Sequence, residues 1–197
     1  MKRIRLSICF GLICAITLSF ARFDALCQDL RDNVFRLHII ANSNSTEDQA
    51  LKLKVRDAIL NVSEDIFLEC ADSEQAIISA QTDIELLRQT AKNVIIENGF
   101  DYEVNIDISP SYFENREYDN FTLPAGEYMA LNIKIGEAKG KNWWCVMFPA
   151  VCIGASCELN NGVNDKSAKV AEGAENYVFR FKTVEIYENL KKYFKKI

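Results

Sequence analysis

The sequence is short of the residues from which metal and phosphate sites are usually built. It has a single histidine, and none of its seven cysteines stands in a CxxC pair, so a structural zinc site is not expected. Only 8 of the 197 residues are glycine. Gly126 and Gly140 have the setting of turn glycines, because neither is placed to open a helix behind a strand around a phosphate. We therefore expect no metal, no cofactor and no small-molecule substrate.

An excess of positive charge is also absent, and so is a second long apolar run. The formal net charge is −5, and an acidic chain argues against nucleic acid as a partner. Beyond the N-terminal segment no stretch is apolar over the ~20 residues that a membrane span requires. Internal repeats and low-complexity stretches are lacking as well, which excludes a repeat architecture.

The N-terminus has the composition of an export signal. Three basic residues precede the uncharged run LSICFGLICAITLSF, and small residues follow at positions 19 and 21. This pattern predicts a signal peptide over residues 1–21 that is cleaved after Ala21, so that the mature chain begins near Arg22 outside the cytoplasm. An uncleaved membrane anchor is the alternative, although the run is short for a span of ~20 residues.

The remaining residues have the composition of one folded domain. Hydrophobic residues make up 49% and aromatic residues 11% of the chain, which is typical of a packed core. We expect an N-terminal linker over 22–33 and a folded domain over 34–152. A polar loop and a C-terminal strand–helix segment are expected over 153–197.

Hydrophobic periodicity predicts alternating strands and helices. Strands are expected over Val34–Ala41, Phe100–Ile108 (stopped by Pro110), Tyr128–Ile135, around Trp143 and over Tyr177–Phe181, with helices from Thr46, from Ser73 to Asn98 and at the C-terminus. The turn 136–141 is expected to join the third strand to the tryptophan strand as a hairpin. Two consecutive helices should make the second strand antiparallel to the first. The predicted fold class is α+β: a two-layer sandwich of a mostly antiparallel sheet with two long helices on one face.

One face of this sheet is predicted to be polar and to carry a docking surface. Arg36 and His38 alternate with the core residues of the first strand, so they share the face that the helices leave uncovered. In the tryptophan strand, Trp143 shares one face with Cys145 and Met147, and Trp144 shares the other with Val146 and Phe148. Both faces of that strand are apolar, so one tryptophan should lie beside Arg36 and His38. Such aromatic and arginine side chains are typical binding anchors.

Five cysteines remain after the signal segment, so at least one thiol should be unpaired. We expect a disulfide within the cluster Cys145, Cys152 and Cys157, with Pro149 able to reverse the chain between Cys145 and Cys152. A cluster of small buried thiols is the alternative.

Two other functions have some support in the residues. Cys145 and His38 could form the thiol–imidazole dyad of an exported hydrolase, with Asp57 or Glu127 orienting the ring. Bulky apolar neighbours of Cys145 disfavour a reactive thiolate, however. A lysine-rich last helix could lie on a membrane surface, although lysines there also complement the helix C-terminus.

Two segments resemble the stage II sporulation protein R family of endospore-forming bacteria. They are RLHIIANSNSTEDQALKLKVRDAIL, residues 36–60, and LPAGEYMALNIKIGEAKGKNWWCVMFPAVC, residues 123–152. The family's marks are an RLHxIANS strand–loop, a KLxVRDA helix and a GxNWWCVxFPPLC strand. Ala150 and Ala138 depart from this pattern, where the family usually has proline and often has glycine.

The resemblance implies a signalling role without catalysis. Members of this family are made in the forespore and exported into the space between forespore and mother cell. There they trigger a membrane-embedded aspartic protease, which processes the inactive precursor of the mother-cell sigma factor, sigma E. The resemblance therefore implies that protease as the partner of this chain.

Overall fold

The computed structural model describes residues 2–118, 121–149 and 178–194, and it divides the chain into two compact units. The sheet unit comprises Asp32–Tyr112 and Glu127–Val163. The helical unit comprises Met1–Arg31, Phe113–Gly126 and Asn164–Ile197. Each unit is described by itself.

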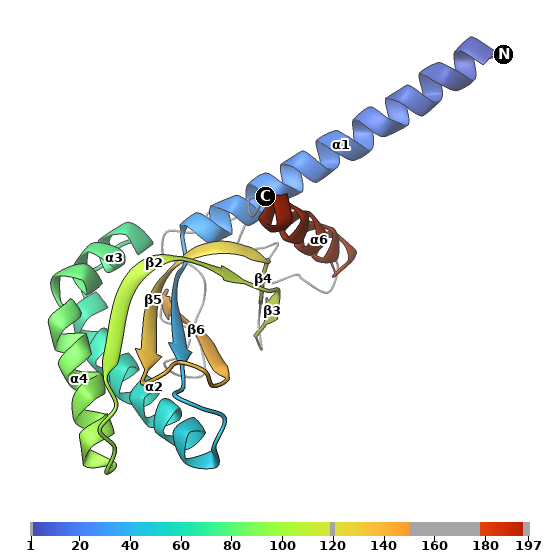
Figure 1. Cartoon of the computed structure of the whole chain (residues 1–197). Coiled ribbons are helices and arrows are strands. Elements are labelled where there is room, and N and C mark those ends of the chain that lie inside the picture. Colours follow the sequence, from blue (N-terminus) through green and yellow to red (C-terminus); the bar gives the residue numbers. More distant parts are fainter. Residues whose placement is uncertain (1, 119–120, 150–177, 195–197) are drawn as a thin grey trace. The chain divides into compact units, whose positions relative to one another are not determined.

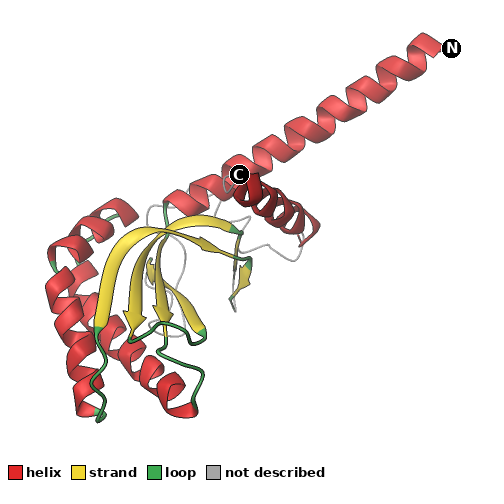
Figure 2. Cartoon of the chain, viewed as in Figure 1, coloured by secondary structure: helices red, strands yellow, loops and turns green. Residues whose placement is uncertain are grey.

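The sheet unit is built on a mixed four-stranded sheet (Figures 1 and 2). Its strands are β1 Phe35–Ile40, β2 Val104–Phe113, β5 Gly126–Ile135 and β6 Asn142–Phe148, in the order β2-β5-β1-β6. Strand β1 pairs in parallel with β5 and antiparallel with β6. The α+β class is therefore confirmed, and β2 runs opposite to β1 as predicted (Figure 1).

The predicted hairpin between β5 and β6 is wrong, because β1 lies between these two strands. The turn that joins them crosses the end of β1 and bonds to it. Lys139 N donates to Asn42 O at 3.1 Å, and Gly140 N donates to Ala41 O at 2.9 Å. A connection of this kind spans two interstrand spacings, about 10 Å, which six residues reach easily.

Three helices cover one face of the sheet: α2 Thr46–Phe67, α3 Ser73–Thr82 and α4 Ile84–Glu97 (Figure 1). Ser45 caps α2, because its Oγ accepts a hydrogen bond from Asp48 N at 3.1 Å. The predicted second helix is divided at Asp83, which ends α3 and begins α4.

The core lies between these helices and the face of the sheet that carries Phe35, Leu37 and Ile39. Phe148 belongs to this core and packs on Phe67, with ring centroids 6.3 Å apart. Alternation along the tryptophan strand instead predicts that Phe148 shares the face of Trp144 and Val146, opposite Cys145 and Met147. A register shift, in which Phe35 pairs with Phe148 but Arg36 pairs with Val146, reverses that expectation.

Strand β2 continues through Pro110 to Phe113, beyond the predicted end at Ile108. It is an edge strand of the sheet, and Pro110 is exposed. A proline is tolerated at an edge because its missing N–H would face away from the neighbouring strand.

We expect Gly140→Ala to lower the free energy of unfolding by about 1–3 kcal/mol, as overpacking does. A Cβ on Gly140 would lie 2.2 Å from the backbone oxygen of Ser43, which cannot move aside as a flexible side chain could. Urea denaturation of both proteins measures the change. Gly99→Asn is the matched control, since Gly99 has a φ of +82° with open space around it, and asparagine tolerates that conformation. Equal stability of Gly140→Ala and the parent would contradict the packing described here.

The helical unit contains α1 Lys2–Asp32, β3 Arg116–Glu117, β4 Thr122–Leu123 and α6 Val178–Phe194. Phe23 and Cys27 of α1 are buried against Phe181 and Val184 of α6. The strand predicted to end at Phe181 is wrong, because residues 178–181 are helical; Tyr177 lies outside the described residues. By length and composition α1 could cross a membrane, and a signal sequence has the same pattern.

Candidate functional site

The pairing of β1 with β6 decides which tryptophan lies on the polar face of the sheet. His38 pairs with Trp144, and Ile39 pairs with Trp143. Paired residues of neighbouring strands project to the same face. Trp144 therefore shares the face of His38, whereas Trp143 shares the face of the core.

The two tryptophans have different surroundings. Trp144 is half-buried, and its ring centroid lies 5.9 Å from that of His38. Trp143 packs against the hydrophobic core, and the Arg56 guanidinium of α2 lies 4.5 Å from its ring centroid. Its Nε1 is buried without a hydrogen-bond partner among the described residues. Trp143 thus packs with the core layer, whereas Trp144 lies half-buried on the polar face beside His38.

Arg36, which the sequence suggested as an exposed anchor, is fully buried. Its Nε lies 3.5 Å from Cys145 O, and its Cζ lies 4.9 Å from the ring centroid of Tyr128, which is itself buried. Alternation along β1 correctly predicts the face of the sheet to which Arg36 projects, but it does not predict that Arg36 is buried. Arg36 therefore projects to the polar side of the sheet, but its side chain is covered in this structure.

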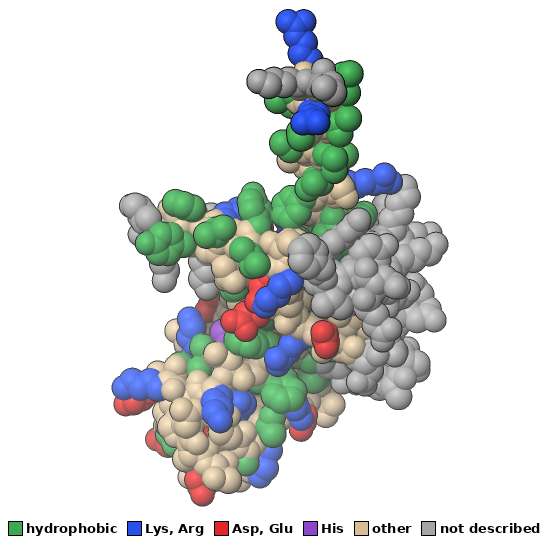
Figure 3. Space-filling view, turned by 90° about the vertical axis from the view of Figure 1, so that its right-hand side faces the viewer, with side chains coloured by type: hydrophobic (Ala, Val, Ile, Leu, Met, Phe, Trp, Pro, Cys, Tyr) green, Lys and Arg blue, Asp and Glu red, His purple; other side chains and the backbone are tan. Residues whose placement is uncertain are grey.

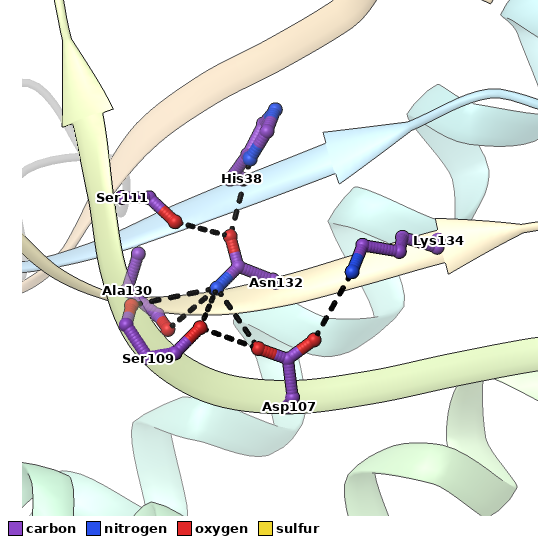
Figure 4. Close-up of polar contacts among 7 residues, drawn as sticks. All are labelled: His38, Asp107, Ser109, Ser111, Ala130, Asn132 and Lys134. Atoms are coloured by element: carbon purple, nitrogen blue, oxygen red, sulfur yellow. Dashed lines mark hydrogen bonds and ion pairs between the residues drawn. The ribbon is translucent and has the colours of Figure 1, made fainter. Parts of the chain in front are cut away.

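A hydrogen-bonded network centred on Asn132 organises the polar face (Figure 4). Asn132 Oδ1 accepts from Ser111 Oγ at 2.8 Å, and His38 Nδ1 lies 3.1 Å from the same oxygen. Asn132 Nδ2 donates to Ser109 Oγ at 3.0 Å and to Asp107 Oδ2 at 3.3 Å. Strands β1, β2 and β5 are thus tied together by side chains on this face.

These contacts define the orientation of the His38 ring. Because Asn132 Nδ2 donates toward Asp107 and Ser109, its Oδ1 faces the ring and lies 3.1 Å from Nδ1. The other nitrogen, Nε2, lies 3.0 Å from Asn142 Oδ1. The ring thus lies between the side-chain amides of Asn132 and Asn142, with its centroid 5.9 Å from that of Trp144. Groups fixed in this way suit a rigid recognition surface.

The thiol–imidazole dyad considered from the sequence does not form. Cys145 pairs with Leu37 and lies on the core face, so the sheet separates it from His38. Cys145 is disulfide-bonded, and a sulfur in a disulfide is not a thiolate nucleophile. The predicted pairing with Cys152 stays a prediction, because Cys152 lies outside the described residues. Asp57, proposed to orient the ring, instead contacts Arg56 at 2.6 Å.

Asp107 carries the main charge of the network. Burial raises its pKa, but the hydrogen bond from Ser109 and the nearby ammonium of Lys134, 3.4 Å away, outweigh burial, so the pKa lies below its ordinary value. Among the described residues, no cluster of histidine, cysteine, aspartate and glutamate could hold a metal ion. Asp107, Asn132 and Lys134 thus place charged and hydrogen-bonding groups side by side on this face.

We expect Asp107→Asn to lower stability slightly at neutral pH, by less than about 1 kcal/mol because the carboxylate is partly exposed. A lowered folded-state pKa contributes stability above the unfolded-state value of ~3.9, and that contribution is lost as the pH falls through the folded-state pKa. The deficit of the variant should therefore shrink below about pH 4. Thermal unfolding of both proteins across this range measures it. A deficit that stays constant down to about pH 3 would contradict the assignment.

The alternation of side chains along β2 and β5 places Asp107, Asn132 and Lys134 on the polar face, in agreement with the structure. Ser109 and Ser111 were not expected there, because Pro110 predicts the end of the strand. The available signal was the period of two, which continues from Asp107 through Ser109 to Ser111.

The fold and the site define an α+β domain that carries a hydrogen-bonded polar face and follows an apolar N-terminal helix. Comparison with known proteins is more specific. The family pattern described as stage II sporulation protein R matches residues 31–158, and the chain belongs to that family.

A curated relative is the stage II sporulation protein R of Bacillus subtilis (strain 168), which is 31% identical over 144 residues. The match covers 73% of this chain and 63% of the relative, so the chain spans less than two thirds of the relative's length. No solved structure matches the chain.

Proposed function

We propose that this chain is an exported sporulation signal that activates a membrane-embedded aspartic protease and so leads to processing of the sigma-E precursor in the mother cell. The observation that carries the proposal is the family match over residues 31–158, which includes β1, α2 and β6. The apolar α1 helix is compatible with export across the forespore membrane. The folded part would then lie in the space between forespore and mother cell.

The polar face supports activation by binding. A ligand shifts a receptor only if it binds the active state better than the inactive state. Trp144 beside His38 offers a large aromatic contact together with fixed hydrogen-bonding groups. Because Asn132 and Asp107 hold these groups in place, little side-chain freedom is lost on docking. We propose that this face contacts the extracytoplasmic part of the protease.

Co-expression in a host that does not sporulate tests the proposal. The chain, the aspartic protease and the sigma-E precursor of the same organism are produced together, and precursor shortening is followed by immunoblot. We expect shortening only when all three are present, and none when a catalytic aspartate of the protease is replaced. An intact precursor in cells that contain exported, folded chain and the protease would refute the proposal.

A further inference from the structure

Helix α6 has two apolar faces, and only one of them is covered. Phe181 and Val184 are buried against Phe23 and Cys27 of α1. The residues of the opposite stripe are exposed to solvent. The exposed fraction of the residue is 53% for Ile186, 53% for Leu190, 65% for Tyr193 and 69% for Phe194. These residues follow the i, i+4, i+7, i+8 spacing of one continuous helix face. An exposed apolar stripe of this length requires an explanation.

The place along α1 where α6 packs against it indicates what covers the exposed stripe of α6. Eight large apolar side chains between Ile4 and Leu18 are more than half exposed, as expected for a segment in lipid (Figure 3). A hydrocarbon core of ~30 Å takes ~20 helical residues. A span that begins at Ile4 therefore ends near Phe23, where the ring of Phe23 lies 5.3 Å from that of Phe181.

A second contact places α6 at the same depth. The ring of Phe20 in α1 lies 5.9 Å from that of Tyr187 in α6, in an edge-to-face arrangement. Figure 1 shows the two helices packed together within the helical unit. The exposed stripe of α6 thus adjoins the end of the apolar segment of α1, at the boundary between acyl chains and headgroups.

Charge on α6 fits an anionic surface. Lys182 and Lys191 are exposed and lie on the two sides of the apolar stripe by helical spacing. Each is paired with a glutamate of the same helix, Lys182 with Glu185 at 3.0 Å and Lys191 with Glu188 at 3.5 Å. Lys192, Lys195 and Lys196 follow in the sequence, so the end of the chain is strongly basic. An amphipathic helix with an aromatic apolar face and flanking lysines is the usual form of a helix that lies in a membrane interface.

We propose that α1 stays attached as a membrane anchor and that α6 lies in the outer interface of the same bilayer. Its exposed stripe inserts among acyl chains, and its lysines contact anionic phospholipid headgroups. This choice adopts the uncleaved alternative for the N-terminus and does not depend on activation of a protease. The basic residues before the span would lie on the cytoplasmic side.

Photolabelling from lipid tests the proposal on the full chain. The protein is reconstituted in vesicles of phosphatidylcholine and phosphatidylglycerol that carry a photoactivatable acyl chain, and tryptic peptides are analysed by mass spectrometry. We expect label on peptide 183–191, which contains Ile186, Tyr187 and Leu190. Peptide 57–88 is the internal control, because its Leu68, Ile78 and Leu86 are 80%, 59% and 51% exposed and belong to the sheet unit. It should remain unlabelled.

A surface variant separates insertion from folding. Ile186→Ser combined with Leu190→Ser alters only exposed positions, so the helix content should persist by circular dichroism while most of the label on α6 is lost. Vesicles of phosphatidylcholine alone should give weaker labelling of peptide 183–191, and equal labelling would overturn the role given to the lysines.

Three results would overturn the placement of α6. The first is labelling of peptide 183–191 no stronger than that of peptide 57–88. The second is chemical cross-linking of α6 between two copies of the chain without lipid label, which would make the stripe a dimer interface. The third is recovery from the producing cells of a chain that begins at Arg22, which would show that α1 is not retained.

Discussion

Arg36→Ala is expected to lower the free energy of unfolding by about 2–5 kcal/mol, the range found when a large buried side chain is truncated. Arg36 is fully buried, and the variant loses its contact with the Tyr128 ring as well as its volume. Urea denaturation followed by circular dichroism measures the change. Signalling should fall only as far as the folded fraction falls.

Lys134→Ala is the matched control for Arg36→Ala, because Lys134 is an exposed cation on the neighbouring strand β5. Its stability should change by no more than about 0.5 kcal/mol. If Arg36→Ala unfolded like the parent and yet failed to signal, Arg36 would be a direct contact with the partner, as the sequence alone suggested.

Trp144→Ala is expected to abolish or strongly reduce processing of the sigma-E precursor while the domain stays folded. Central aromatic anchors typically cost 2 kcal/mol or more in binding, which is about 30-fold in affinity. Trp143→Ala is the paired variant, one residue away on the opposite face. It should lower stability by about 1–3 kcal/mol, because it removes packing on the core and the contact with Arg56.

Immunoblots of the precursor measure processing with the two tryptophan variants, and unfolding curves measure their stability. A stable Trp144→Ala protein that supports full processing would remove Trp144 from the docking surface. So would a Trp143→Ala protein with unchanged stability and lost processing, which would place the contact on the helical layer.

Local periodicity predicted most of the elements in the sheet unit and the two faces of β1. Local periodicity does not predict the order of the strands in the sheet, and a short turn between antiparallel strands usually indicates a hairpin. Here the turn instead bonds to Ala41 and Asn42 at the end of β1. The register shift that moves Phe148 into the core likewise has no signal in a pattern of alternate residues.

The candidate site shows a different limit of sequence reasoning. Alternation places Arg36, His38 and Trp144 on one face, but it does not show how deeply each is covered. Burial depends on what packs above a residue from distant parts of the chain, and here Arg36 is fully buried whereas His38 is partly accessible. In α6 two apolar stripes compete, and the one with Phe181 and Val184 packs inward.

A binding titration between the full chain and the extracytoplasmic part of the aspartic protease tests the central claim most directly. The parent and Lys54→Ala, a substitution on the exposed side of α2, should bind alike, and Trp144→Ala should bind about 30-fold more weakly or worse. Parent-like binding by Trp144→Ala together with loss of binding by Lys54→Ala would contradict the account and place the interface on the helices.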